Sequence, residues 1–269
     1  MTDSKRRNVF NQGDQCMLVD KRERRYLIKL EESSLFSTHL GNLSHDDVIG
    51  HQDGTRVTTS RGHVVLAFKP TMADYTRLMP RIATVIYPKD IGAILALGDI
   101  YPGLKIVEAG CGSGAVTLVL ARTVGEQGQV ITYDVRQDMI DRARENVAIA
   151  LPDHPQLRFK LGDVSKQIDE SDVDRIFLDL PEPWDVVTHA GNALVPGGIF
   201  ISFVPTVLQF QDLTTALRAD RRFQLIETVE VLVRPWSSGS RSVRPAQRMV
   251  AHTGFITTAR KCEEPKQDD

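Results

Sequence analysis

Residues 106–115, "IVEAGCGSGA", join an apolar, β-forming run to three closely spaced glycines, Gly110, Gly112 and Gly114. A helical pattern, "GAVTLVLARTVG", follows at once and ends at Gly125. Glycine tolerates backbone conformations that bring the main chain close to a ligand. The segment therefore predicts a strand, a ligand-binding loop and a helix in direct succession.

Strand and helix patterns alternate from Pro88 onward. The predicted strands are "LKIVEA", "QVITYD", "LRFKLGD", "VDRIFLDL" and "GGIFISFVP", and the helices between them include "PKDIGAILALGDI", "DMIDRARENVAIA" and the short "DVVTHAGNAL". This alternation predicts an α/β, Rossmann-like fold, a parallel sheet with helices on both faces. Two later strands, "FQLIETVEVLV" and "RMVAHTGFITTARK", are expected as an antiparallel pair at the sheet edge, joined by a loop rich in Pro, Ser and Arg.

The first 65 or so residues have a different texture. "QCMLVD" and "RRYLIKL" bracket the charged turn "KRE", and "DGTRV" and "RGHVVLAF" continue the short-strand pattern. "PTMADYTRLMPR" predicts a connecting helix over 70–81, starting at Pro70 and interrupted near Pro80. We therefore expect a small β-rich domain over residues 1–68 and the α/β domain over 69–269.

Composition excludes several classes of protein. Of 269 residues, 41% are hydrophobic and 25% charged, which is ordinary for a globular chain, and no apolar run approaches a membrane span. The N-terminus lacks the apolar segment of a signal peptide. Cys16, Cys111 and Cys262 suit neither a disulfide framework nor a zinc site, so we expect free thiols in a reducing cytoplasm.

Carboxylates end four of the predicted strands or follow them, namely Glu108, Asp134, Asp163 and Asp179. An acid at the position of Asp134 can accept the ribose hydroxyls of a nucleoside, which NAD and S-adenosylmethionine (SAM) both carry. Gly110, Gly112 and Ala115 also fit the dinucleotide pattern G-x-G-x-x-A. Glu108, however, would repel a pyrophosphate and suits the ammonium and sulfonium of SAM.

Taken singly, each of these residues also fits a purely structural role. A single acid at a strand end is as well explained as a helix cap or a solvated loop residue. Four in register beside a glycine loop favour a site. Cys111 has no histidine partner nearby in sequence and is interpreted as a small residue that fills the loop. His39, His45 and His51 are interpreted as loop residues, and no metal site is predicted.

The segment "FLDLPEPWD", residues 177–185, is the most specific in the chain. Asp179 ends a buried strand, so its carboxylate should face the cleft above the cofactor. Pro181 and Pro183 stiffen the turn, and Trp184 offers an aromatic plane, although a packing role for Trp184 is equally compatible with the pattern. The pattern is similar to the acid-Pro-Pro-aromatic loops of enzymes that methylate amino groups of nucleic-acid bases.

Over nearly its whole length the chain resembles the tRNA (adenine-N1)-methyltransferases that modify adenosine 58 in the T-loop. The resemblance rests on "STHLGNLSHDDVIG", "FKPTMADYTRLMPRIATVIYPKDIGAI", "VEAGCGSGAVTLVLAR", "VRQDMIDRARENV", "DRIFLDLPEPW", "LVPGGIFISFVPT" and "HTGFITTARK". The "YPKD", "DLPEPW" and "HTGF" stretches are specific to that family, whereas the glycine loop is generic. The resemblance implies a small N-terminal β-domain, a Rossmann-like catalytic domain and a homotetramer.

Residue roles follow from the same resemblance. Asp179 would be the catalytic acid at the target base, and Tyr87 would form part of the cofactor wall. Asp134 stands where the family usually has glutamate for the ribose, Asp163 would hold the adenine amine, and Cys111 stands where many members have threonine. The implied SAM site comprises Tyr87, Glu108, Gly110, Cys111, Gly112, Ser113, Gly114, Asp134, Val135, Asp163, Val164 and Asp179.

Contacts with tRNA are expected from Pro181, Trp184, Arg234, Arg244 and His252. Basic residues cluster in "SKRR" (4–7), in "KRERR" (21–25) and between Arg234 and Arg248, where Arg241 lies, although runs of charge are usually solvated surface. The net charge of −2 implies a patchy surface assembled across subunits. We expect tRNA affinity to fall steeply with salt.

Three further functions remain open at this point. The first is a SAM-dependent methyltransferase of a protein or small molecule, similar to protein isoaspartate methyltransferases. The second is an NAD-dependent oxidoreductase, which lacks a plausible Tyr/Lys or His catalytic set here. The third is a non-catalytic tRNA-binding subunit, which would not keep both the glycine loop and Asp179. Whether adenosine 57 is also methylated stays undecided.

Overall fold

The computed structural model describes residues 8–239 and 242–263 and divides into two compact units, Met1–Pro80 and Arg81–Asp269. The division falls between Pro80 and Arg81 and not after residue 68, because helix α1 (Met72–Leu78) belongs to the first unit. Arg25 Nη1 donates to Asp74 Oδ1 of this helix at 2.6 Å. The "SKRR" stretch at 4–7 and Arg241 lie outside the described residues.

The first unit is the predicted β-rich domain. Its elements are β1 (Gln15–Val19), β2 (Arg25–Lys29), β3 (Leu35–Thr38), β4 (Gly41–Ser44), the 3-10 turn η2 (His45–Asp47), β5 (Thr55–Thr58) and β6 (Val64–Phe68). Four of the strands form an antiparallel sheet in the order β2-β1-β6-β5, and β3 pairs with β4. The predicted turn over "KRE" is confirmed as the link between β1 and β2. Phe10, Leu18 and Leu30 are fully buried in its core.

Helix α1 is shorter than predicted. It begins at Met72 and not at Pro70, because Thr71 is its N-cap: the Thr71 hydroxyl accepts from the Asp74 N–H, and the Asp74 carboxylate accepts from the Thr71 N–H. It ends at Leu78, before Pro80, whose ring cannot continue a helix. The capping box therefore sets the start of the helix.

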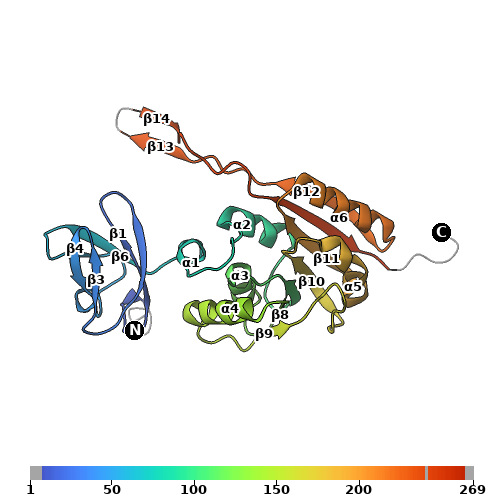
Figure 1. The fold of residues 1–269 in the computed structure, drawn as a ribbon, viewed down its shortest axis with the longest axis horizontal. Helices are drawn as coiled ribbons and strands as arrows, with labels where there is room; N and C mark the ends of the chain where they lie inside the picture. The colour runs from blue at the N-terminus through green and yellow to red at the C-terminus, as the bar shows by residue number, and fades with distance from the viewer. Residues whose placement is uncertain (1–7, 240–241, 264–269) are drawn as a thin grey trace. The chain divides into compact units, whose positions relative to one another are not determined.

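The second unit contains a seven-stranded sheet. Its strands are β7 (Lys105–Ala109), β8 (Gln129–Asp134), β9 (Leu157–Leu161), β10 (Val173–Leu178), β11 (Leu194–Val204), β12 (Phe223–Glu230) and β15 (Phe255–Lys261). The order is β12-β15-β11-β10-β7-β8-β9 (Figure 1). The strands from β11 to β9 are parallel, and β15 runs antiparallel to both β11 and β12, which confirms the predicted antiparallel pair at this edge.

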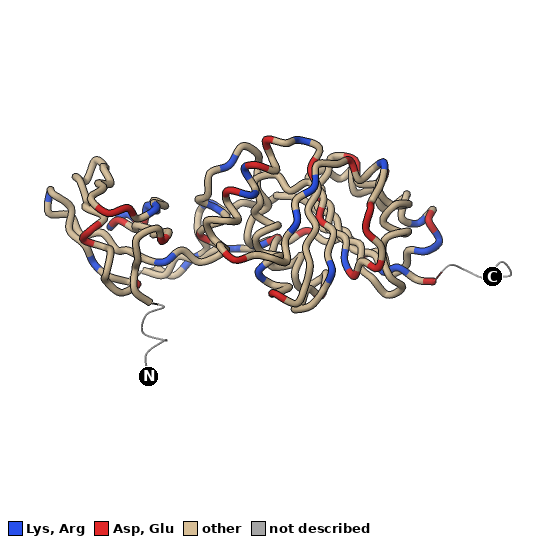
Figure 2. The backbone as a smooth tube through the Cα atoms, turned by 90° about the horizontal axis from the view of Figure 1, so that it is seen from below, with Lys and Arg blue, Asp and Glu red and all other residues tan. Residues whose placement is uncertain are grey.

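Helices cover both faces of this sheet, as predicted. They are α2 (Pro88–Leu97), α3 (Ala115–Val124), α4 (Gln137–Ala150), α5 (Val187–Ala193) and α6 (Val207–Ala219). Figure 1 shows α3 and α4 beside β8 and β9, and α5 and α6 toward β11 and β12. The central strand β7 is buried on both sides, which explains its continuous apolar run. Acidic and basic residues are interspersed along both units (Figure 2).

Two segments of this unit differ from prediction. The short helix predicted over "DVVTHAGNAL" (185–194) is confirmed as α5, but it begins at Val187, because the residues before it form a 3-10 turn, η3 (Pro183–Val186). The stretch expected as a Pro/Ser/Arg loop contains a β-hairpin, β13 (Trp236–Gly239) and β14 (Ser242–Pro245). Nearly all of its described residues are exposed, so its sequence carries no buried stripe by which a strand could be recognised.

Candidate active site

The glycine loop joins β7 to α3 and has left-handed backbone at all three glycines, with φ of +85° at Gly110, +51° at Gly112 and +85° at Gly114. A Cβ on Gly110 would lie 2.1 Å from the main-chain oxygen of Asp179, and one on Gly114 would lie 3.0 Å from Cα of Ala143. A Cβ on Gly112 would meet no protein atom within 4 Å. Two glycines therefore permit close packing, and the third faces open space.

The other two loop residues are turned inward. Cys111 is 4% exposed, and its Sγ lies 3.6 Å from Asp134 Oδ2. Burial, together with the charges of Glu108 and Asp134, holds the pKa of this thiol well above its usual range, so it stays protonated and does not suit a nucleophile. Ser113 is 2% exposed, and its Oγ accepts from the Ile82 N–H at 3.2 Å.

Three carboxylates, those of Glu108, Asp134 and Asp179, surround the loop. Burial raises the pKa of Glu108 to about 7, with contributions from the charges of Asp179 and Asp134. Burial and the charge of Asp134 raise the pKa of Asp179 to about 7 as well. A cationic ligand would relieve this repulsion, whereas a pyrophosphate would increase it. The arrangement therefore fits the ammonium and sulfonium of SAM.

A small cavity of about 50 Å³ lies at the ends of β7, β8 and β9. It is lined by Ala109, Gly110, Tyr133, Asp134, Val135, Gly162, Asp163, Val164 and Leu180. Asp134 Oδ2 accepts from the Gly112 N–H at 3.3 Å, which fixes this carboxylate beside the loop. Asp163 Oδ1 accepts from the N–H and hydroxyl of Ser165, at 3.0 and 2.6 Å. The sequence-predicted residues for the nucleoside part of the cofactor are thus brought together.

A larger cavity of about 460 Å³ contains Asp179. It is lined by Thr84, Val85, Ile86, Tyr87, Asp179, Phe203, Pro205, Val250, His252 and Thr253. The Asp179 carboxylate has no hydrogen-bond partner among the described residues, so it is available to a ligand. Asp179 lines this cavity and the next residue, Leu180, lines the smaller one. The turn after β10 therefore belongs to both cavities.

The wall of the larger cavity depends on a buried ionic cluster of Lys89, Asp90 and Thr253. Lys89 Nζ donates to Asp90 Oδ1 at 2.7 Å, to Thr253 Oγ1 at 2.6 Å and to the Val231 carbonyl at 2.6 Å. The Thr253 hydroxyl donates to Asp90 Oδ2 at 2.8 Å, and Asp90 is fully buried. The "YPKD" and "HTGF" stretches thus meet through hydrogen bonds.

Sequence reasoning missed Phe203, Pro205 and Thr253 as cavity residues. The signal for Thr253 was present, since "HTGF" stands out as a specific stretch, but nothing in the letters relates it to "YPKD". Gly254 explains the close approach of Phe203, because a Cβ there would lie 2.4 Å from Cζ of that ring. The glycine thus allows the loop before β15 to pass directly over the aromatic side chain.

The residues predicted to contact tRNA are not all brought together. His252 lines the larger cavity, whereas Pro181 and Trp184 line neither cavity. The Pro181 carbonyl accepts from Gln209 Nε2 at 2.9 Å, and Trp184 is half-buried in η3. Arg234 and Arg244 are exposed on the segment that carries the β13–β14 hairpin.

All three cysteines are free, as predicted. Within residues 8–239 and 242–263, no group of three or more His, Cys, Asp or Glu side chains is arranged to hold a metal ion. None of the described helices combines the length and the apolar character needed to cross a membrane.

A Rossmann-like sheet whose glycine loop lies among Glu108, Asp134 and Asp179, of which Asp179 faces a second cavity and has no hydrogen-bond partner among the described residues, defines a SAM-dependent methyltransferase. Residues 63–244 match the family model described as "tRNA methyltransferase complex GCD14 subunit", and residues 9–57 match "TrmI-like N-terminal". The chain belongs to this family of tRNA methyltransferases. Family membership decides against the oxidoreductase left open by the glycine pattern.

Relatives cover almost the whole chain. It is 37% identical to the tRNA (adenine(57)-N(1)/adenine(58)-N(1))-methyltransferase TrmI of Methanocaldococcus jannaschii, over 93% of this chain and 95% of that one. It is 35% identical to the tRNA (adenine(58)-N(1))-methyltransferase TrmI of Thermus thermophilus, over 91% and 96%.

Solved structures extend the comparison to the fold. A SAM-dependent O-methyltransferase from Thermotoga maritima superposes with a TM-score of 0.93 at 33% identity and covers 98% of both chains. The tRNA (m1A58) methyltransferase TrmI of Aquifex aeolicus superposes with 0.84 at 26% identity, over 96% of this chain and all of the other.

Proposed function

We propose that this protein transfers the methyl group of SAM to N1 of adenosine 58 in the tRNA T-loop, with adenosine 57 as a second candidate acceptor. The observation that carries the proposal is the position of Asp179. Its carboxylate faces a cavity of about 460 Å³ without a hydrogen-bond partner among the described residues, one residue before Leu180 of the smaller cavity. A base held by Asp179 would therefore lie next to the nucleoside-binding side of the site.

Two acids of the smaller cavity provide acceptors that SAM requires: Asp134 would accept hydrogen bonds from the ribose hydroxyls, and Asp163 would accept one from the adenine amine. Glu108, buried in β7 just before the glycine loop, would balance the positive charge of the methionine end. Gly112 leaves open space beside the loop. When bound, SAM supplies a methyl group carried on a cationic sulfur.

The reaction requires the protein mainly to position the two reactants and to stabilise the charge that develops. N1 of adenine has a free lone pair, so no covalent nucleophile on the enzyme is needed. An ionised Asp179 would accept from the N6 amine, orient N1 and stabilise the positive charge that develops on the ring. Because the pKa of Asp179 is raised to about 7, the fraction of Asp179 that is ionised in the protein without ligands increases as the pH rises through the neutral range. The target base must first be extruded from the folded tRNA.

The decisive experiment is incubation with labelled SAM and unmodified tRNA, followed by nucleoside mapping by mass spectrometry. Label in N1-methyladenosine at position 58 is expected. Label in a ribose O-methyl group would favour the activity named for the Thermotoga structure. Label on protein or on a small acceptor, with none on tRNA, would contradict the proposal.

Asp179→Ala separates catalysis from cofactor binding. We expect SAM affinity to be largely kept and turnover to be lost, because the carboxylate lines the acceptor cavity. Asp185→Ala, an exposed acid in η3, is the matched control and should leave both unchanged. Equal loss of affinity and turnover in Asp179→Ala would mean that Asp179 belongs to the cofactor site.

We also propose a homotetramer that acts on tRNA in the cytoplasm. The exposed segment around the β13–β14 hairpin supports assembly, since Leu232, Val233, Trp236 and Val243 are 51–71% exposed in the single chain. Apolar side chains gathered on one projecting hairpin are typical of a subunit contact. Light scattering of Trp236→Ser is expected to give smaller particles than wild type, with Ser238→Ala as the control. A monomeric wild-type protein would refute the assembly.

A further inference from the structure

The ring of His252 is held between two oxygen atoms. Nδ1 lies 2.6 Å from Glu230 Oε1, and Nε2 lies 2.7 Å from the carbonyl oxygen of Pro205. A carbonyl oxygen can only accept a hydrogen bond, and so can an ionised carboxylate. Both ring nitrogens must therefore carry a hydrogen, which makes His252 an imidazolium cation in this arrangement.

Charged and titratable groups from several described elements surround this cavity. Glu230 comes from β12, Lys89 and Asp90 come from α2, and Asp179 and Tyr87 line the same cavity. From β15, the Phe255 ring packs 5.1 Å from the imidazole, and Phe210 of α6 packs 4.8 Å from Phe255. The hydrogen bond to Glu230 and the one to Pro205 raise the pKa of His252, while the charge of Lys89 lowers it.

The two hydrogen bonds join three segments that follow one another across the sheet. Glu230 ends β12, Pro205 follows β11, and His252 precedes β15, which lies between those two strands. Pro205, His252 and Thr253 all line the cavity that contains Asp179. A neutral imidazole has only one N–H, so on losing a proton the ring would turn a lone pair toward one of its two oxygen partners. One of the two connections would then be lost.

We propose that His252, in its protonated form, is a positioning residue that fixes the Pro205 and 250–253 wall of the acceptor cavity, so that proton loss at this ring weakens the placement of the target base opposite Asp179. The inference rests on the proposed function, since it assigns that cavity to the tRNA base. His252 needs no contact with the reacting atoms for this role.

The first test is the pH dependence of kcat/KM for unmodified tRNA at saturating SAM. Wild type should lose activity on the alkaline side as His252 deprotonates. In Glu230→Gln this alkaline decline in kcat/KM, the alkaline limb of the profile, should move to lower pH, because the neutral amide no longer stabilises the His252 imidazolium. His252→Gln should lower kcat/KM about tenfold, the effect of one charge-assisted hydrogen bond, and should lack the limb. His189→Gln, on α5, is the matched control and should behave as wild type.

A second measurement does not depend on tRNA. NMR titration of ¹³C-labelled histidine, with the His252 signal assigned from His252→Gln, should give a pKa above the ordinary value of about 6.5 that falls in Glu230→Gln. SAM affinity and circular dichroism, which should be unchanged in all variants, establish that each one is folded.

The outcomes separate the two proposals. An alkaline limb that persists in His252→Gln, or that stays in place in Glu230→Gln, overturns the role of His252. A His252 pKa that Glu230→Gln leaves unmoved does so as well. If wild type fails to methylate any tRNA but the titration behaves as expected, the proposed function is wrong while the protonated ring of His252 stands.

Discussion

The main chains of Gly110 and Asp179 are in direct contact. The Asp179 N–H donates to the Ala109 carbonyl at 2.9 Å, and the Cα of Gly110 faces the Asp179 oxygen so closely that a Cβ would lie 2.1 Å from it. The glycine loop after β7 and the turn after β10 are therefore in backbone contact.

Comparing Gly110→Ala with Gly112→Ala tests this backbone contact. In Gly110→Ala the new Cβ collides with backbone, which cannot move aside cheaply, so we expect a loss of more than about 2 kcal/mol in unfolding free energy, together with loss of SAM binding. Gly112→Ala meets open space and should cost only about 1 kcal/mol, the strain of left-handed backbone. Urea unfolding of the two variants measures the difference. Equal stability losses would contradict the contact.

Asp179→Asn should change how stability depends on pH. The pKa of Asp179 is about 7 when folded, against an ordinary 3.8, so between these values the folded protein binds a proton that the unfolded chain does not. Unfolding free energy therefore falls as pH rises through this window, and the loss is complete above pH 7. The amide of Asp179→Asn does not titrate in this window. The unfolding free energy of Asp179→Asn relative to that of wild type should therefore increase by more than about 1 kcal/mol between pH 5 and pH 8.

Thermal unfolding of the two proteins at both pH values, with Asp185→Asn as the exposed control, measures this gain. A pH-independent difference between Asp179→Asn and wild type would mean that the carboxyl is not held protonated by its surroundings.

Lys89→Met should be strongly destabilising. Lys89 Nζ is the cationic partner of the fully buried Asp90. Among the described residues its removal leaves the buried carboxylate with the Thr253 hydroxyl as its one side-chain partner, at a cost of roughly 3–5 kcal/mol. Adding Asp90→Asn to Lys89→Met should recover part of that loss. Thr253→Ser keeps the hydroxyl and should stay close to wild type in urea unfolding. A double variant no more stable than Lys89→Met would argue against the charge explanation.

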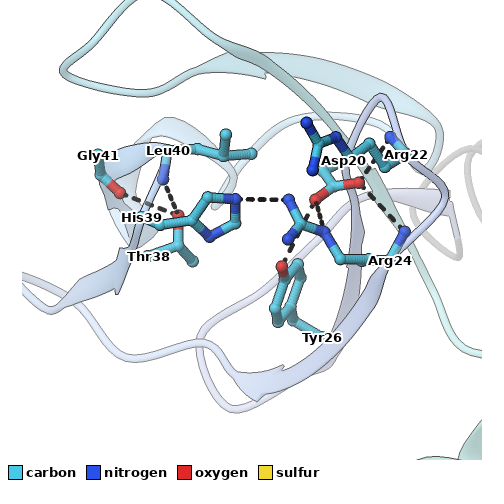
Figure 3. A network of polar contacts seen from close by, with 8 residues as sticks. All are labelled: Asp20, Arg22, Arg24, Tyr26, Thr38, His39, Leu40 and Gly41. Carbon is cyan, nitrogen blue, oxygen red and sulfur yellow. Dashed lines mark hydrogen bonds and ion pairs between the residues drawn. The ribbon is translucent and has the colours of Figure 1, made fainter.

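Arg22 and Arg24 offer a matched pair for testing tRNA contact by the first unit. Figure 3 shows the Arg24 side chain hydrogen-bonded to Asp20 and to His39. The Arg22 main-chain N–H donates to Asp20 Oδ1 at 2.7 Å, but its exposed side chain has no polar partner among the described residues. Within this basic stretch, Arg24 and Arg25 are therefore paired with carboxylates, whereas Arg22 is available to phosphate.

Arg22→Ala should leave stability within about 0.5 kcal/mol of wild type and reduce by about one the slope of log affinity for tRNA against log salt. Arg24→Ala should instead lower stability by about 1–3 kcal/mol, because the Asp20 carboxylate loses its charged partner. Filter binding at several salt concentrations measures the slopes. An unchanged slope in Arg22→Ala would exclude this turn from the tRNA contact.

Much of the fold can be predicted from the pattern of apolar residues and from the glycines and prolines that end helices and strands. Strands such as β7 and β8 are continuous apolar runs because both of their faces are buried, and Gly125 marks the end of α3. The same regularity predicted the site, because parallel strands align their carboxyl ends, which brings Asp134, Asp163 and the glycine loop to one cavity. Asp179 could be predicted for the same reason.

The rest depends on side chains that meet across long stretches of sequence. Nothing in the letters relates Lys89 to Thr253, or His252 to Glu230 and Pro205, because these contacts arise only once β15 is inserted between β11 and β12. Trp184 shows that closeness to a site residue in sequence does not predict a place in the site. It is close to Asp179 in sequence, yet the 3-10 turn η3 carries it away from both cavities.

The place of β15 in the sheet has a consequence for the order in which the protein is made. Phe255–Lys261 lies between two strands that are synthesised earlier, and His252 and Thr253 come shortly before it in the chain. A ribosome must therefore release the chain as far as β15 before this wall of the larger cavity can form, whereas the glycine loop and its carboxylates emerge much sooner. The growing polypeptide cannot complete the wall of the larger cavity until β15 has been synthesised.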